Sequence, residues 1–176
     1  MKDVICASDY VMVARGGDLG MHFDLEEIPR IQSSIIREAQ KCGVPTMVAT
    51  QLLESMIEQP VPTRAEVVDI TNAVMEGVDS LLLTGETAVG KYPVEAVQWL
   101  RRVATEYEDE VHVDRGGVMA NLTDRLALGI VQLAEDIGAK IVIYSRGGGR
   151  FVEAISRYRP RVPTYVASVM RRCLEG

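Results

Sequence analysis

The chain has 176 residues, of which 47% are hydrophobic and 25% charged, a composition typical of a globular protein with one large or two small domains. Its formal net charge of −6 argues against a nucleic acid or an anionic membrane as the main partner. No apolar run approaches the roughly 20 residues that a membrane-spanning helix needs. The first residues also lack the apolar core of a signal peptide. We therefore expect a cytoplasmic protein.

Cysteine and histidine are sparse. Cys6, Cys42 and Cys173 lie far apart and form no CxxC pair, so we expect reduced thiols. Only His22 and His112 are present, which makes a histidine-rich zinc site implausible.

Three short apolar runs in the first part of the chain predict β-strands at residues 10–14, 45–49 and 80–83. Runs that are apolar throughout are typical of parallel sheets covered on both faces. The chain is therefore expected to belong to the α/β class.

Three helices are predicted between and after these strands. The first ends at Gly43, the second begins with a capping box formed by Thr63 and Glu66, and the third has Pro93 in its first turn. Apolar residues recur at helical spacing in each helix, and those of the third are expected on its inner face. In chain order they are Ile28, Ile31, Ile35, Ala39 and Cys42; Val67, Ile70 and Val74; and Val97, Leu100 and Ala104.

A charged segment that ends at Gly117 predicts a linker over residues 108–117, between a first domain of residues 1–107 and a second of residues 118–176. The second domain is expected to contain an amphipathic helix, a strand at 141–144, a helix at about 151–158 and a strand at 164–167. The apolar residues that define its first helix are Leu122, Leu126, Ile130, Leu133 and Ile137.

Each of the first three predicted strands runs into a small polar loop, at residues 15–18, 50–55 and 84–90. In a parallel array, the carboxyl ends of the strands point the same way, so these loops should converge on one face. Each loop taken alone is also compatible with a simple turn. Three consecutive strands ending in such loops favour a binding site.

The residue types in these loops suit an anion bound with a metal ion. Asp18 offers the hard oxygen that Mg²⁺ prefers. Gly16 and Gly17 allow backbone amides to approach an anion closely. The hydroxyls of Thr50 and Thr84 can bind phosphate or carboxylate oxygens, or relay a proton through water.

Taken together, the stretches VMVARGGDLG, VATQLLESM, PTRAE and LLTGETAVGKYP resemble the pyruvate kinase family in order and spacing, over residues 2–107. A weaker likeness continues through AISRYRP at 154–160 and is similar to that family's C-terminal domain. The resemblance implies the last three βα units of a (β/α)₈ barrel, followed by part of an α/β C-terminal domain. It also implies transfer of the phosphoryl group of phosphoenolpyruvate to ADP in glycolysis, with Mg²⁺ and K⁺ as cofactors.

The resemblance assigns roles to individual residues. Asp18 would be a Mg²⁺ ligand, and the amides of Gly17 and Asp18 would hold the substrate carboxylate. Thr50 would bind that carboxylate near the carbon that becomes protonated. Thr84, where the family more often has serine, would lie near the nucleotide phosphates and a proton-relay water. Arg64 would reach the site of a neighbouring subunit in a homo-oligomer, which is a tetramer in complete members of the family.

The chain departs from the family pattern in its loops. The family has one glycine before the aspartate of the first loop, and the second glycine here would either shift the register of the substrate-binding amides or bulge the loop. In the second domain, a possible effector loop consists of Ser145, Arg146, Gly147, Gly148, Gly149 and Arg150. Its glycines and arginines suit an anion, but its few hydroxyls argue against the usual sugar bisphosphate; a flexible turn is the alternative.

The resemblance also implies that barrel strands one to five are missing, together with the catalytic lysine that they carry in the family. We therefore expect the chain alone to be inactive. It should associate or rearrange, because an incomplete barrel exposes two sheet edges and an apolar face. Two alternatives stay open, namely one subunit of a split enzyme and a non-catalytic anion-binding or regulatory module.

Overall fold

A computed structural model describes residues 1–111, 121–145 and 149–168 of the chain, and within them the side chain of Asp18 lies outside the described part. The chain divides into two compact units, residues 1–112 and 113–176. Each unit is described by itself. The predicted linker falls partly on residues that are not described, and of the remainder Glu108–Glu110 form a short 3₁₀ helix, so the linker stays a prediction.

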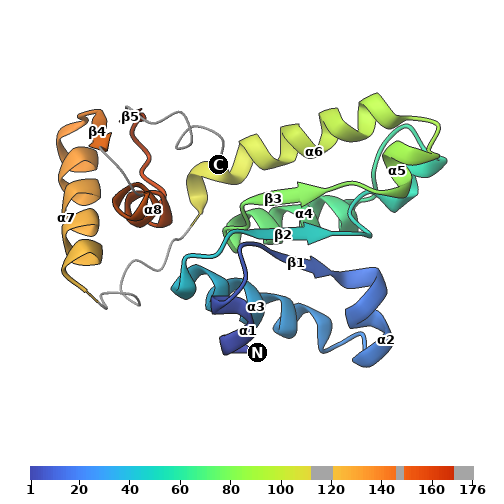
Figure 1. Ribbon diagram of the computed structural model, residues 1–176. Coiled ribbons are helices and arrows are strands. Elements are labelled where there is room, and N and C mark those ends of the chain that lie inside the picture. The colour runs from blue at the N-terminus through green and yellow to red at the C-terminus, as the bar shows by residue number, and fades with distance from the viewer. Residues whose placement is uncertain (112–120, 146–148, 169–176) are drawn as a thin grey trace. The chain divides into compact units, whose positions relative to one another are not determined.

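The first unit alternates strands and helices, as the apolar runs predict (Figure 1). Its helices α3, α4 and α6 run alongside the sheet (Figure 1). In chain order its elements are α1 (Lys2–Cys6), β1 (Val11–Ala14), the π-helical turn η1 (Arg15–Leu19), α2 (Gly20–His22), α3 (Ile28–Cys42), β2 (Thr46–Ala49), the 3₁₀ helix η2 (Glu54–Ile57), α4 (Arg64–Met75), β3 (Ser80–Leu82), α5 (Gly85–Ala88), α6 (Pro93–Tyr107) and the 3₁₀ helix η3 (Glu108–Glu110).

The first sheet is parallel, in the order β1-β2-β3. Its register places Ala14, Ala49 and Leu82 in one row, so the three strands end at the same level. The arrows in Figure 1 point the same way, with α2 and α5 beyond their tips. The loops after the three strands therefore leave from one edge of the sheet, as predicted.

The predicted helix boundaries of the first unit follow from local chemistry. Gly43 ends α3 with a φ of 70°, a left-handed conformation that glycine adopts without steric cost. Thr63 and Glu66 form the predicted capping box at the start of α4. Pro93 occupies the first position of α6.

The core of the first unit lies between the sheet and its helices. Val13 and Val48 of the sheet pack in one buried cluster with Ile36, Ile70 and Val103 of the helices. The prediction that Val97 lies on the inner face of α6 is wrong, because Val97 is 51% exposed and Ala96 and Val103 are buried instead. Leu100 and Ala104 do pack against the core.

The other face of the first sheet carries exposed apolar side chains, including Met12 and Leu82, with Tyr10 just before β1. This is the open apolar face that we expected from the end of a barrel. Such a face normally packs against further protein.

The second unit contains α7 (Leu122–Ile137), β4 (Ile141–Ser145), α8 (Arg150–Arg157) and β5 (Thr164–Ser168). Strands β4 and β5 pair in parallel. The predicted amphipathic helix is present as α7, but its bulky apolar stripe is not its buried face. Leu122, Leu126, Ile130, Leu133 and Ile137 are all exposed, and the buried residues of α7 are Asp124, Ala127, Leu128, Val131 and Ala134.

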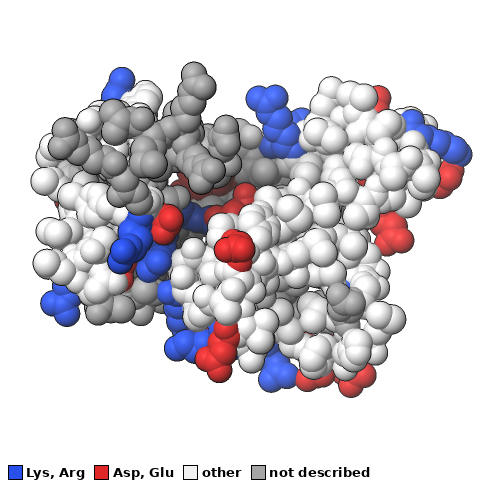
Figure 2. Space-filling model, viewed as in Figure 1, with Lys and Arg blue, Asp and Glu red and all other residues white. Residues whose placement is uncertain are grey.

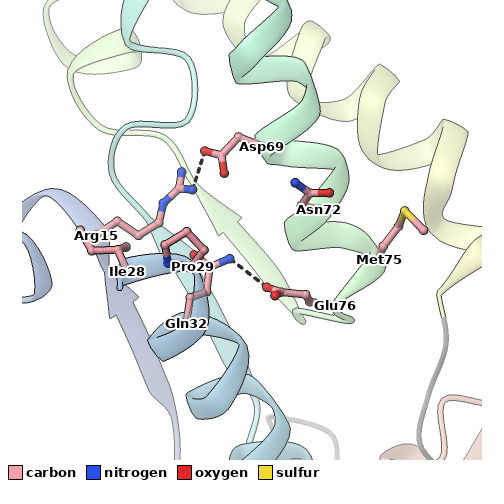
Figure 3. A pocket seen from close by; sticks show the side chains of 8 residues that line it. All are labelled: Arg15, Ile28, Pro29, Gln32, Asp69, Asn72, Met75 and Glu76. Atoms are coloured by element: carbon pink, nitrogen blue, oxygen red, sulfur yellow. Dashed lines mark hydrogen bonds and ion pairs between the residues drawn. The ribbon is translucent and has the colours of Figure 1, made fainter. Parts of the chain in front are cut away.

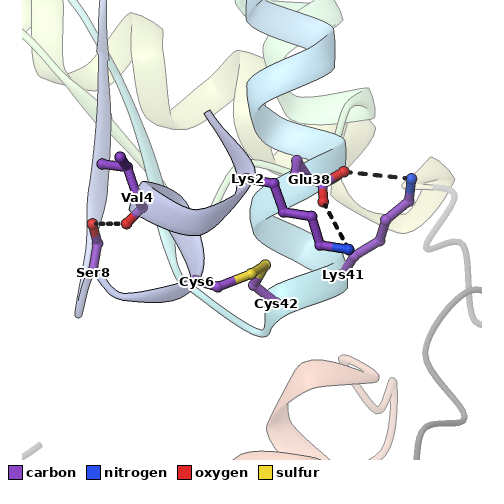
Figure 4. The surroundings of a disulfide bond; sticks show 7 residues. All are labelled: Lys2, Val4, Cys6, Ser8, Glu38, Lys41 and Cys42. Carbon is purple, nitrogen blue, oxygen red and sulfur yellow. Dashed lines mark hydrogen bonds and ion pairs between the residues drawn. A yellow bond between two sulfur atoms is a disulfide. The ribbon is translucent and has the colours of Figure 1, made fainter.

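A disulfide joins Cys6 to Cys42, which contradicts the expectation of reduced thiols (Figure 4). Helix α1 packs against α3, so the two Cα atoms lie 5.2 Å apart, within the range that a disulfide spans. The 36-residue spacing in sequence hides this proximity. Cys173 lies outside the described residues.

Among the described residues, no helix is both long and apolar enough to cross a membrane. On the face shown in Figure 2, acidic and basic side chains are interspersed with uncharged surface.

Candidate active site at the carboxyl edge of the first sheet

The loop after β1 is a wide helical turn, η1. The N–H of Gly20 donates to the carbonyl oxygen of Arg15, five residues back, where an α-helix would bond four residues back. We expected the extra glycine either to shift the register of the amides or to bulge the loop. The backbone shows the bulge, because the turn holds one more residue than an ordinary helical turn.

The two glycines of this turn differ in their surroundings. A Cβ atom on Gly16 would lie 3.0 Å from Cδ of Gln51 and 3.2 Å from Oγ1 of Thr50, whereas one on Gly17 would meet nothing within 4 Å. At Gly16 the first two loops therefore approach too closely for a side chain, whereas Gly17 has room for one.

The loop after β2 begins with two residues in left-handed conformation. Thr50 has a φ of 69° and Gln51 a φ of 53°. The Thr50 hydroxyl accepts a hydrogen bond of 2.8 Å from the backbone N–H of Gly16. Beyond the turn, Leu52 and Leu53 are fully buried and anchor the loop in the core.

The loop after β3 is tied to the β2 loop by a buried carboxylate. Glu86, in the short helix α5, is only 1% exposed. It accepts hydrogen bonds from the N–H of Leu53 at 2.9 Å and of Thr84 at 2.8 Å, and from the Thr84 hydroxyl at 3.3 Å. Burial alone would raise the pKa of Glu86, but these hydrogen bonds and one from its own backbone outweigh burial and lower it. Glu86 is therefore ionised at neutral pH and joins the two loops.

A second carboxylate supports the same region. Besides completing the capping box, Glu66 accepts hydrogen bonds from the backbone N–H of Ser55 at 2.8 Å and from its hydroxyl at 2.5 Å. Burial pushes the pKa of Glu66 upward, and the bonds from Ser55 and Thr63 reverse that shift and lower the pKa. The sequence suggests that Glu66 only caps α4. In the structure it also holds Ser55 of the loop after β2.

The structure brings most of the predicted site residues to one edge. Gly17 lies in η1, half-buried Thr50 follows β2 and exposed Thr84 follows β3. The backbone of Asp18 lies in η1 as well, but its side chain is outside the described part. Arg64 is exposed at the first position of α4.

The possible effector loop is only partly described. Ser145 ends β4, Gly149 precedes α8 and Arg150 begins it. Arg146, Gly147 and Gly148 lie outside the described residues, so an effector site here stays a prediction.

Sequence reasoning missed two charged residues of the site, Arg15 and Glu86. Both are buried, at 7% and 1% exposure, although Arg and Glu are almost never fully buried unless paired. No spacing rule marks them, because Arg15 bonds to Asp69 and to carbonyls of the loop after β2, and Glu86 accepts from Leu53 of that loop as well as from Thr84. Their position directly beside the glycines of the loops is the only signal that the sequence offers.

The described residues contain no group of three or more His, Cys, Asp or Glu side chains that could hold a metal ion. Glu86 is occupied by its hydrogen-bond donors. The described residues therefore offer no complete Mg²⁺ site at this edge, and a role of Asp18 as a Mg²⁺ ligand stays a prediction.

A parallel βα array with polar loops at the carboxyl edge of its strands defines an α/β protein of the barrel or open-sheet class. The family model for the barrel domain of pyruvate kinase matches residues 1–97. The chain therefore belongs to the pyruvate kinase family.

Individual relatives agree with this assignment. The pyruvate kinase of Pyrobaculum aerophilum is 44% identical over 168 residues, which are 96% of this chain and 36% of the relative. The pyruvate kinase of Aeropyrum pernix is 46% identical over 162 residues, which are 91% of this chain and 35% of the relative. The crystal structure of the Pyrobaculum aerophilum enzyme superposes with a TM-score of 0.83 over 95% of this chain and 39% of its own. The crystal structure of a Cryptosporidium parvum pyruvate kinase, which is 36% identical, superposes with a TM-score of 0.84 over 96% of this chain and 36% of its own. The chain thus spans about a third of the length of these relatives.

Proposed function

We propose that this chain supplies part of a phosphotransferase site that moves the phosphoryl group of phosphoenolpyruvate to ADP, giving pyruvate and ATP. The main support is the edge formed by β1, β2 and β3, whose loops are joined by the Gly16–Thr50 and Leu53–Glu86 hydrogen bonds. Phosphoryl transfer depends chiefly on positioning and charge neutralisation, and bonds between loops provide positioning. The relatives named pyruvate kinase support the reaction.

Each loop has a role in this proposal. The amides of Gly17 and Asp18 bind the substrate carboxylate, and the Thr50 hydroxyl binds it from the next loop. Because the Thr50 hydroxyl already accepts from Gly16, its own proton is free to be donated to an anion. Thr84 lies towards the nucleotide phosphates and orients the water that protonates the product.

Metal ions and partners complete the site. Asp18 would hold Mg²⁺, which would supply positive charge to neutralise the phosphate, and K⁺ would supply a further positive charge. The chain works in the cytoplasm as part of a homo-oligomer, in which exposed Arg64 reaches the neighbouring subunit. A second charged loop, from Ser145 to Arg150, binds a small anionic effector.

A chimera tests the proposal, in which this chain replaces the matched segment of the Pyrobaculum aerophilum enzyme. Pyruvate formation, followed through lactate dehydrogenase, should be retained. Thr50→Val should lower kcat/KM by about 10- to 100-fold, because a hydrogen bond to a charged group contributes about 1.5–3 kcal/mol. Thr84→Val should lower kcat with a smaller effect on KM. Thr105→Val, at an exposed position of α6, is the matched control and should change neither.

The same assay separates the alternatives. The chain by itself should give no pyruvate, and turnover by the isolated chain would contradict the expectation that it is inactive alone. Activity that appears on adding a separate N-terminal barrel chain would favour a split enzyme. A folded chimera that binds phosphoenolpyruvate without turnover would favour a non-catalytic module and refute the proposed reaction.

A further inference from the structure

The backbone after β2 is unusual. Thr50 and Gln51 both have positive φ, yet neither is glycine, and only Arg159 shares this property among the non-glycine residues of the described part. A left-handed conformation costs an ordinary residue roughly 1–2 kcal/mol. Two such residues in succession persist only where the surroundings hold them, and such strain concentrates at functional sites.

Arg15 makes the contacts that hold this turn. Its guanidinium is almost completely buried, and Nη2 donates to the carbonyl oxygens of Thr50 at 3.2 Å and Gln51 at 3.0 Å. Its Nη1 donates to Asp69 Oδ2 at 2.5 Å (Figure 3). Asp69 belongs to α4, the helix that follows the turn. The rigid guanidinium fork therefore joins the end of β1 to the turn and to α4.

Arg15 lines a cavity of about 380 Å³ together with Asp69 and residues of α3 and α4. Figure 3 shows the side chains that line it. The Asp69 side chain is 39% exposed, so solvent screens part of its attraction to Arg15. Its consequence is geometric, because it fixes the plane of the guanidinium. Both carbonyls of the left-handed turn then receive their donor from the same nitrogen.

We propose that Arg15 is a positioning residue, which holds Thr50 and Gln51 in the left-handed conformation and so sets the position of the Thr50 hydroxyl at the site. The claim that Arg15 holds the left-handed turn rests on the hydrogen bonds alone. Its importance for turnover rests on the proposed function, since it needs Thr50 to bind the substrate. Lysine would not replace arginine, because one ammonium group cannot reproduce the planar fork.

A double-mutant cycle on this chain tests the conformational part. Arg15→Gln should lower the unfolding midpoint, measured by the fluorescence of Trp99. Gln51→Gly should recover part of the loss, because glycine adopts a positive φ without steric cost. We expect the two changes to be coupled by roughly five-fold or more in the unfolding equilibrium constant. Arg159→Gly is the matched control, since it relieves a positive φ in the second unit and should not couple to Arg15. Additive effects of Arg15→Gln and Gln51→Gly would overturn the proposal.

Arg15→Lys keeps the charge and serves if the glutamine variant does not fold. The ¹³Cα and ¹³Cβ chemical shifts of Thr50 and Gln51 should indicate left-handed backbone in the parent and move away from it in Arg15→Lys. Unchanged shifts would refute the positioning role, because a residue that only fills space would lower stability without moving them.

The chimera separates this inference from the proposed function. Arg15→Lys should lower kcat, and Gln51→Gly should restore part of it in the double variant. If the shifts move and the cycle couples while Thr50→Val leaves activity intact, the proposed role of Thr50 fails and Arg15 remains the residue that holds the turn.

Discussion

Helices α3 and α7 are of similar length, at 15 and 16 residues, and both show apolar residues at helical spacing, yet they differ in what they bury. Helix α3 buries Ile36 and Ala39, and its Gln32 side chain donates a hydrogen bond to Glu76, the residue that follows the last turn of α4. Helix α7 exposes its bulky stripe and buries a second stripe of mostly smaller residues against β4 and α8. Spacing identifies a helix, but where two apolar stripes exist, the packing partner decides which one is buried.

The largest expected effect contrasts the two helices directly. Ile36→Ala removes a side chain that is 0% exposed and should cost about 2–5 kcal/mol of unfolding free energy, because a cavity is left. Ile137→Ala, at 67% exposure, should stay within about 0.5 kcal/mol. Urea unfolding followed by circular dichroism measures both. Equal costs would show that the α7 stripe is covered, and the contrast would disappear.

The disulfide gives a second difference, since it joins α1 to α3 in the first unit only. Closing a loop of 36 residues should stabilise the first unit by about 4 kcal/mol. Cys42→Ser should therefore lower the midpoint reported by Trp99, as should reduction of the parent with dithiothreitol. Cys173→Ser is the control and should leave the response to reductant unchanged. A parent protein that is insensitive to reductant would argue against the bond.

Substitution of Glu86 tests whether the loops after β2 and β3 depend on an ionised carboxylate. Its pKa in the folded protein is below the ordinary value of 4.5, so its contribution is present above that pH and is lost as the pH falls through the folded pKa. Glu86→Gln should cost about 1–3 kcal/mol at pH 7, and the difference from the parent should shrink in acid. Glu106→Gln, at an exposed position, should show no such dependence. If the difference in unfolding free energy between Glu86→Gln and the parent stayed constant across pH, the charge of Glu86 would not contribute to stability.

The smallest effect should be common to both units. Thr63 caps α4 by accepting from the N–H of Glu66, and Asn121 caps α7 by accepting from that of Asp124. Replacement of either by alanine should cost about 1 kcal/mol, the usual value of such a cap. Thermal unfolding of the two variants would show whether the units differ in local helix chemistry as well as in packing, and clearly unequal losses would sharpen the comparison.

Much of the fold could be predicted from the sequence because its signals are local. Gly43, the Thr63–Glu66 box and Pro93 mark helix ends through backbone chemistry, and the apolar runs mark all five strands. The meeting of the loops followed from the parallel arrangement. Contacts between distant segments could not be predicted: the Cys6–Cys42 bond, the exposed side of α7, and the burial of Arg15 and Glu86 all depend on tertiary packing.

The common row of Ala14, Ala49 and Leu82 has a consequence for where the chain tolerates insertions. One residue added inside β2 would turn Val48 out of the core and move Thr50 by about 3.3 Å along the strand, because strand side chains alternate between faces. The turn after β1 contains an additional glycine without any such inversion. We therefore expect this sheet to tolerate a change of length at Gly17, but not the addition of one residue inside β2, the strand that precedes Thr50.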